Sequence, residues 1–271
     1  MFLVLSHILS FVVLLVNSIY DVFNNHDVPD VPGLIGIVGG LGLHGAYSLS
    51  SAGLEAVAWS IGVGVIFSIY GWGAYWRGMW GGADAMTLSA LGFTAAGPVS
   101  GAFNLGYVLD LIANFMFASV AVTIVYSVYK FVSQGGGLID FLNAVRQREV
   151  TLAGTVVLAG LIGALMNSQG FNGLVFFLLI SVSGVVFVFL KMVQDKYMIL
   201  EKSPEEVEAG DVASPGQGFG RKIRGLTEEE ASEVSDTVEV RTGVPFIPVF
   251  LLALLLTDLT SSGIWILYGL Y

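Results

Sequence analysis

Two aspartates in this sequence lie at positions where burying a carboxylate costs free energy. Asp21 directly follows the apolar run 2–20, and Asp84 ends the sequence Gly81-Gly82-Ala83-Asp84 just before another apolar run. A carboxylate at the boundary of a membrane-embedded segment is costly and usually functional. If helix packing brings two such groups together, one can stay ionised while the other holds a proton. Such a pair can activate a water molecule and polarise a carbonyl, which is the chemistry of an aspartic protease.

The position of each aspartate on its expected helix predicts which of the two is ionised. Asp84 lies near a helix N-terminus, where the helix dipole favours an anion, whereas Asp21 lies near a helix C-terminus. We therefore expect Asp84 to be the general base and Asp21 the acid, within a pair that shares its proton. Gly81 and Gly82 lack a Cβ, so a substrate backbone can approach Asp84 closely. With Ala83, they are the expected supporting or substrate-binding residues.

The composition is that of a polytopic membrane protein. Of the 271 residues, 55% are hydrophobic and 12% are charged, and the mean hydropathy is +0.80. The chain has no cysteine, and its three histidines match no metal-ligand spacing, so we expect neither a metal nor another cofactor. A formal net charge of −10 argues against a nucleic-acid partner. The first apolar run lacks the flanks of a signal peptide and is expected to be retained as a span.

Eight apolar runs are candidates for membrane-spanning helices, because such a helix needs about 20 apolar residues. The fourth run is short and rich in glycine and alanine, so the pattern is compatible with six to eight spans. We predict an all-α polytopic membrane helix bundle, with a membrane part at 1–193, an acidic cytoplasmic loop at 194–243 and a final transmembrane helix at 244–271. The runs are 2–20, 32–50, 53–74, 83–98, 104–130, 150–168, 172–193 and 245–268.

The basic residues orient these spans. With eight spans and an external N-terminus, all 11 Lys and Arg fall on one side, which the positive-inside rule makes cytoplasmic. Omitting the fourth span would place Arg77 opposite the later basic residues, so the charge pattern supports that span. Asp21 and Asp84 then both lie at the cytoplasmic face of a multi-pass protein of the cell membrane. Asp110 and Asp258 lie in the outer halves of their spans, where we expect each to cap a helix, pair with a neighbour or face a polar pocket.

Acidic residues are concentrated in one segment. Residues 194–243 hold 12 of the 21 Asp and Glu. We interpret this segment as a flexible, solvated connection with the acidic surface of a protein adapted to high salt. Its charge would attract a basic peptide, although salt would screen that attraction. The stretch 214–218, with Ser, Pro, two Gly and Gln, is its most mobile part by composition.

These motifs together resemble those of the archaeal prepilin and preflagellin peptidases, in the type IV prepilin peptidase family of G-x-G-D membrane aspartyl proteases. The resemblance covers most of the chain, in order. The matching features are Tyr20-Asp21, Val28-Pro29-Asp30, Gly81-Gly82-Ala83-Asp84-Ala85 with Leu88 and Leu91, Gly225-Leu226-Thr227-Glu228-Glu229-Glu230 and Gly243-Val244-Pro245-Phe246-Ile247-Pro248.

The resemblance implies an aspartic endopeptidase with Asp21 and Asp84 as its catalytic residues. Members of this family cut a short basic leader from archaellin or type IV pilin-like precursors, just before the apolar helix that later assembles into the filament. The implied partners are therefore precursor leader peptides and membrane lipid. The leader is cytoplasmic, as are both aspartates in the predicted topology. With the acidic segment, the resemblance implies an archaeon of salty environments as the source.

The chain departs from the family pattern at two places. Ala83 stands where the second glycine of the motif is usual. The segment after Asp21 looks one residue longer than the common pattern, and it has Asn24, Asn25 and His26 where Lys or Arg is usual. The longer segment leaves two other carboxylates as alternatives for the first catalytic position, namely Asp27 and Asp30. We prefer Asp21 because it directly ends the apolar run.

Three other classes of protein compete with this interpretation. Intramembrane proteases of the presenilin or signal-peptide-peptidase type faintly share Tyr20-Asp21, the 81–84 motif and Pro245-Phe246, but in that family several spans precede the first aspartate. An ion-coupled transporter would use Asp110 and Asp258 as embedded sites, yet we see no internal repeat of the kind common in such folds. A non-catalytic assembly scaffold is a further alternative.

Overall fold

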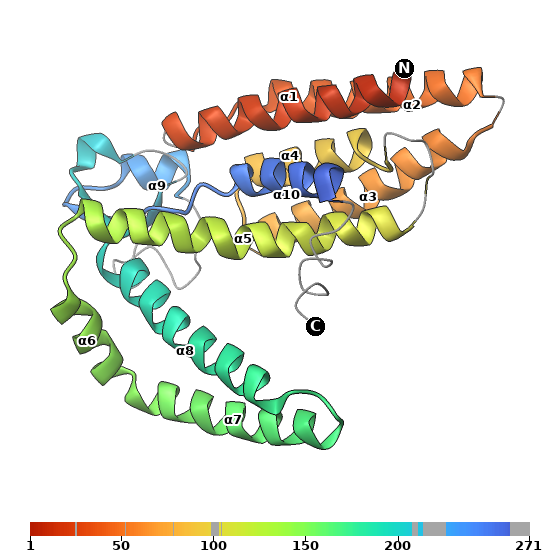
Figure 1. The fold of residues 1–271 in the computed structure, drawn as a ribbon. Helices are drawn as coiled ribbons and strands as arrows, with labels where there is room; N and C mark the ends of the chain where they lie inside the picture. The colour runs from red at the N-terminus through yellow and green to blue at the C-terminus, as the bar shows by residue number, and fades with distance from the viewer. Residues whose placement is uncertain are drawn as a thin grey trace. The chain divides into compact units, whose positions relative to one another are not determined.

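The chain is an all-α polytopic helix bundle, as the sequence predicts (Figure 1). The computed structural model describes residues 1–24, 26–51, 53–77, 79–98, 103, 105–207, 211–213 and 226–260. Six helices within these ranges are long and apolar enough to cross a membrane. They are α1 (Phe2–Phe23), α2 (Asp30–Ser50), α3 (Glu55–Trp76), α5 (Leu105–Ser133), α7 (Glu149–Ser168) and α8 (Gly173–Lys196). One compact unit comprises Met1–Thr123 with Val244–Tyr271, and a second comprises Ile124–Gly243.

Two of the eight predicted spans are shorter than a bilayer core in the part that the structure describes. The fourth corresponds to α4 (Gly82–Thr94) with 13 residues, and the last to α10 (Ile247–Thr260) with 14. At 1.5 Å per residue each is about 20 Å long, whereas the hydrocarbon core is about 30 Å thick. The predicted residues 261–268 of the last span lie outside the described residues.

The short helix α4 forms the centre of the first unit. It packs against α1, α2, α3 and α10, and Figure 1 shows it beside α10. Its Leu88 and Leu91 belong to one buried apolar cluster with Leu14 of α1, Phe67 of α3 and Phe250 of α10. A helix surrounded in this way can be short, because its neighbours rather than lipid cover its ends.

Two glycines allow the neighbours of α4 to approach at backbone contact. A Cβ on Gly40 of α2 would lie 2.6 Å from the carbonyl oxygen of Phe93, and a Cβ on Gly92 would lie 2.9 Å from Cα of Gly64 in α3. Lipid tails are as apolar as the helices, so close packing of small residues is a main source of helix association in a membrane. A side chain at either glycine would therefore push α4 away from α2 or α3.

The C-terminal carbonyls of α4 are satisfied by side chains of other helices. Ser60 of α3 donates from Oγ to the carbonyl oxygen of Phe93 at 2.7 Å, and Ser6 of α1 donates to that of Thr94 at 2.6 Å. The last carbonyls of any helix lack an intrahelical partner, and an unpaired carbonyl is costly away from water. These hydroxyls therefore allow α4 to end inside the bundle.

The second unit contains a small sheet as well as helices. After α6 (Leu138–Gln147), α7 and α8, the strands β1 (Ile199–Lys202), β2 (Val212–Ala213) and β3 (Val238–Arg241) form an antiparallel sheet in the order β1-β3-β2. The 3₁₀ turn η1 (Pro204–Glu206) and helix α9 (Glu228–Ser232) lie between strands in the chain.

The described part of the acidic segment is thus folded, not merely solvated. Val238 and Val240 of β3 alternate into a small core with Val207 and Leu226, as expected for a strand with one buried face. Its acidic side chains remain mostly at the surface. The stretch 214–218, predicted to be the most mobile, lies outside the described residues.

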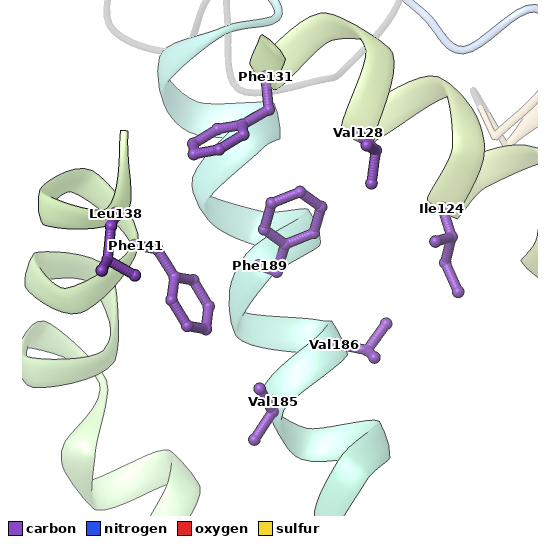
Figure 2. A pocket seen from close by; sticks show the side chains of 8 residues that line it. All are labelled: Ile124, Val128, Phe131, Leu138, Phe141, Val185, Val186 and Phe189. Carbon is purple, nitrogen blue, oxygen red and sulfur yellow. The ribbon is translucent and has the colours of Figure 1, made fainter. Parts of the chain in front are cut away.

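An apolar groove of about 510 Å³ lies between α6, α8 and the C-terminal part of α5 (Figure 2). Three aromatic rings form much of its wall, with ring centroids 5.5 Å apart for Phe131 and Phe189 and 6.3 Å apart for Phe141 and Phe189. Its lining side chains are all apolar. Such a lining offers no group that would orient a polar ligand, and the groove is not a candidate for chemistry.

Asp140, in the first turn of α6, ties this helix to the end of α8. Its carboxylate accepts hydrogen bonds from Lys196 Nζ, from Tyr197 Oη at 2.8 Å and from the backbone N–H of Gly137 at 3.2 Å. The lysine, followed by the tyrosine and the backbone N–H, holds the pKa of Asp140 at about 2, well below its ordinary 3.8. At neutral pH, Asp140 is therefore ionised and can accept all three hydrogen bonds.

Asp140→Asn should loosen α6 without unfolding the protein. The amides of α6 should exchange with deuterium about two- to fivefold faster, because an exposed ion pair contributes modestly. In the parent, the same loosening should appear only as the pH falls below 3.8 towards 2, because a carboxyl with a lowered pKa loses its contribution on protonation. Asp236→Asn, at an exposed position, is the control. Equal exchange of α6 in both variants would contradict the tie.

Candidate active site

Asp21 lies in the last turn of α1 and is held at both carboxylate oxygens. Its side chain is only 7% exposed. Oδ1 lies 2.8 Å from His26 Nδ1, and Oδ2 accepts the backbone N–H of Ile247 at 2.9 Å. Ile247 is the first residue of α10. Asp21 therefore binds an otherwise unpaired N–H at the start of the last helix, where the helix dipole favours a negative charge.

Asp84 lies in the first turn of α4 and is half-buried. Its Oδ2 accepts the backbone N–H of Gly81 at 3.0 Å, the residue that precedes the helix. This is the carboxylate arm of a capping box, in which the third helical residue reaches back to the N-cap. The local sequence thus both starts α4 and points its carboxylate to the end of the helix.

One buried hydrogen bond sets the register of the two helices that carry the aspartates. Asn17 Nδ2 donates to Thr87 Oγ1 at 2.9 Å. Asn17 precedes Asp21 by one helical turn, and Thr87 follows Asp84 by about one turn. Since Ser6 of α1 reaches the far end of α4, the two helices run antiparallel. The bond therefore places both aspartates at the same level of the bundle.

The two carboxylates lie close enough for their charges to interact. The electrostatic environment of Asp84 includes the like charge of Asp21 and, more weakly, the charge of His26. Like charges disfavour each other, so one carboxylate of such a pair is ionised more easily when the other holds a proton. The structure thus brings together the two residues that the sequence pairs.

The hydrogen bonds favour a different division of roles from the one expected. Asp84 has the predicted helix N-terminus, but Asp21 has one too, because the start of α10 meets it. Asp21 is paired with two donor groups, Ile247 N–H and His26, whereas Asp84 accepts a hydrogen bond from the backbone N–H of Gly81. A carboxylate with more donors is the better anion. We therefore assign the resting negative charge to Asp21 and the proton to Asp84.

An aromatic cluster joins the entrance of α4 to α10. The ring of Trp80 lies 5.4 Å from that of Phe246 and 6.0 Å from that of Phe250, and Phe115 of α5 stacks on Phe250 at 5.3 Å. Aromatic contacts of this kind stabilise beyond the area they bury. They hold the start of α10, and hence the N–H of Ile247, beside Asp21. Trp80 lies close to Asp84 in the sequence, but its partners come from the distant helices α5 and α10.

The three residues before Asp84 have different surroundings. Gly81 is exposed, and a Cβ on it would lie 3.4 Å from Asp84 Oδ2. A Cβ on Gly82 would lie 3.7 Å from the ring of Tyr75, which is an ordinary contact. Packing within the chain therefore does not require glycine at either position. Ala83 packs against the apolar core of the first unit. The predicted role of the glycines in admitting a substrate remains a prediction.

The other candidate aspartates lie in different environments. Asp27 and Asp30 are exposed, the latter at the start of α2. Asp110 is half-buried in α5. Asp258 has polar contacts at both carboxylate oxygens, which lie 3.0 Å from His7 Nδ1 and 2.9 Å from the hydroxyl of Tyr107. Of these four residues, Asp258 alone pairs with a neighbouring helix as the sequence predicts for the outer aspartates.

Known proteins do not identify the chain further: a scan against family models and searches of curated proteins and of solved structures found no match. Within the described residues, no group of three or more His, Asp or Glu side chains is arranged to hold a metal ion.

A cysteine pair tests whether the two aspartates face each other. The chain has no cysteine, so Asp21→Cys combined with Asp84→Cys introduces the only two thiols. We expect a short bis-thiol reagent to link them in the membrane, detected as an intramolecular adduct by mass spectrometry. Asp21→Cys with Asp258→Cys is the matched control, because Asp258 follows Ile247 by eleven positions along α10. Linking of the control but not of the test pair would contradict the site.

Thr87→Val tests the bond that sets the register. The substitution keeps the shape of the side chain but removes the acceptor of Asn17. We expect the free energy of unfolding in detergent to fall by about 0.5–2 kcal/mol, and the yield of the 21–84 thiol link to fall with it. Ser119→Ala removes only a local bond to Met116 and should change neither quantity. An unchanged thiol link in Thr87→Val would show that other contacts set the register.

Proposed function

We propose that this chain is a membrane aspartyl endopeptidase. Its substrates are archaellin or type IV pilin-like precursors, from which it removes a short basic leader at the cytoplasmic membrane face. The observation that carries this proposal is the pairing of Asp21 and Asp84, which come from α1 and α4 and lie at the same level of the bundle. The family resemblance of the motifs around both residues supports the choice of substrate.

The hydrogen bonds suggest how the pair would hydrolyse a peptide bond. Asp21, ionised, takes a proton from water as the water oxygen attacks the scissile carbonyl carbon. Asp84 gives its proton to the carbonyl oxygen, so that a neutral gem-diol forms. On collapse, the C–N bond breaks, Asp21 passes its proton to the leaving amine, and Asp84 recovers a proton from a diol hydroxyl. The pair returns to its starting state with one proton.

The position of the site suits a substrate that is partly in the membrane. Asp21 ends an apolar helix, and Asp84 begins one. A precursor whose leader ends just before an apolar helix would present its scissile bond at such a boundary. The one-sided distribution of Lys and Arg supports a cytoplasmic location for this end of the bundle, where the leader also lies.

A second candidate function is supported by the cluster of His7, Tyr107 and Asp258. Ionisable residues buried between membrane helices commonly belong to ion pathways, so an ion-coupled transporter would use this cluster. The contacts of Asp258 also serve a purely structural purpose, because they join α10 to α1 and α5. We therefore rank this function below hydrolysis.

Leader cleavage in membranes tests the proposal. A precursor with a basic leader is incubated with the parent, Asp21→Ala, Asp84→Ala and the control Asp27→Ala, each checked for membrane insertion. We expect Asp27→Ala to cleave like the parent and the two site variants to lose at least about 10²-fold in rate. Cleavage that survives in either site variant would overturn the assignment of the pair.

The same assay separates the alternative functions. Cleavage deep within an apolar helix, instead of at its edge, would indicate an intramembrane protease of the presenilin type. If the inserted parent cleaves no precursor, ion uptake into vesicles by the parent and by Asp258→Asn tests the transporter. Uptake that depends on Asp258 but not on Asp84 would replace the peptidase proposal.

A further inference from the structure

His26 lies in the connection between α1 and α2 and is oriented towards the site. Its Nδ1 is 2.8 Å from Asp21 Oδ1. The two side chains differ in exposure: that of His26 is 37% exposed, whereas that of Asp21 is 7% exposed. A partly exposed histidine thus contacts a buried carboxylate.

The backbone at His26 is unusual. Its φ is 66°, which makes it the only non-glycine residue of the described chain with a positive φ. This conformation is uncommon except for glycine, although Asn, Asp and His adopt it more readily than other residues. The backbone N–H of Asp27 donates to the carbonyl of Asn24 at 2.9 Å, and Asn24 Nδ2 donates to the carbonyl of Asp27 at 3.0 Å. These bonds hold the turn that presents His26 to Asp21.

The chemistry of the contact defines which atom carries the proton. An ionised carboxylate can only accept, so the Nδ1 of His26 must be the donor whether the ring is neutral or charged. With Ile247 N–H on Oδ2, both oxygens of Asp21 are then held from different directions. A carboxylate held in this way cannot rotate, and its remaining lone pairs point to a defined place.

We propose that His26 is a positioning residue of the Asp21–Asp84 site, which holds Asp21 ionised and correctly oriented by a hydrogen bond from Nδ1–H. This inference rests on the proposed peptidase function for its kinetic consequence, but the contact itself can be measured without a substrate. His26 stands in the segment where the chain departs from the family that it resembles. The longer segment thus places a histidine in contact with Asp21, the first of the two aspartates.

The tautomer of His26 tests the contact independently of activity. The chain has three histidines, so ¹⁵N-histidine NMR of the full-length protein in micelles is readily assigned with His26→Asn. At high pH, where the ring is neutral, we expect His26 to carry its proton on Nδ1, which is the minor tautomer of free histidine in water. Asp21→Ala should return it to the Nε2–H form, and Asp84→Ala should not. An unchanged tautomer in Asp21→Ala would overturn the proposal.

A pair of substitutions at His26 tests the kinetic role. Glycine and asparagine both accept a positive φ, so His26→Gly and His26→Asn preserve the turn. Asparagine also offers Nδ2–H in place of the histidine Nδ1–H. We expect His26→Gly to lower kcat for leader cleavage about tenfold or more with little change in KM, and His26→Asn to recover most of the loss.

Each other outcome of the kinetic test has a defined meaning. If His26→Gly cleaves as fast as the parent, or if His26→Asn is as slow as His26→Gly, the hydrogen bond has no positioning role and the proposal is overturned. If the parent itself cleaves no precursor, the peptidase function fails, and the tautomer measurement still decides whether His26 holds Asp21.

Discussion

The hydrogen bond from Ile247 N–H to Asp21 Oδ2 joins the first helix to the last and defines the environment of the site. It places a buried carboxylate at the N-terminus of a helix, where the helix dipole favours an anion. It also gives the first N–H of α10 a partner inside a bundle where an unpaired group is costly. Trp80, Phe115 and Phe246 hold that end of α10 in place. Together with the contact from His26, this hydrogen bond distinguishes the surroundings of Asp21 from those of Asp84.

A small number of polar pairs positions the helices of the first unit around α4. Asn17 with Thr87 links α1 to α4, Asn114 with Thr257 links α5 to α10, and His7 with Asp258 links α1 to α10. Apolar packing alone is weakly specific in a membrane, because one apolar face resembles another. Hydrogen bonds select a register, since a shift of one residue would leave both partners unpaired. The bond between Asn17 and Thr87 thereby places the two carboxylates at the same level of the bundle.

The sequence was most informative where local rules apply. Six of the eight apolar runs correspond to long helices in the described residues, and Gly81-Gly82-Ala83-Asp84 predicted both the start of α4 and its acidic first turn. The pairing of Asp21 with Asp84 followed from topology. The division of roles was not predictable, because one donor to Asp21, Ile247, is more than 200 residues away and the other, His26, lies in a turn with an uncommon positive φ. The small sheet was missed because its strands are short and lie among charges.

The most direct test of the central claim is to find which aspartate carries the shared proton. A diazo compound esterifies a protonated carboxyl group with release of N₂ and leaves a carboxylate unmodified. At mildly acidic pH, the parent should be esterified at Asp84 before Asp21, as read by mass spectrometry of the two peptides, and leader cleavage should fall in step with the modification. Preferential modification of Asp21, or equal modification of both, would contradict the pair described here.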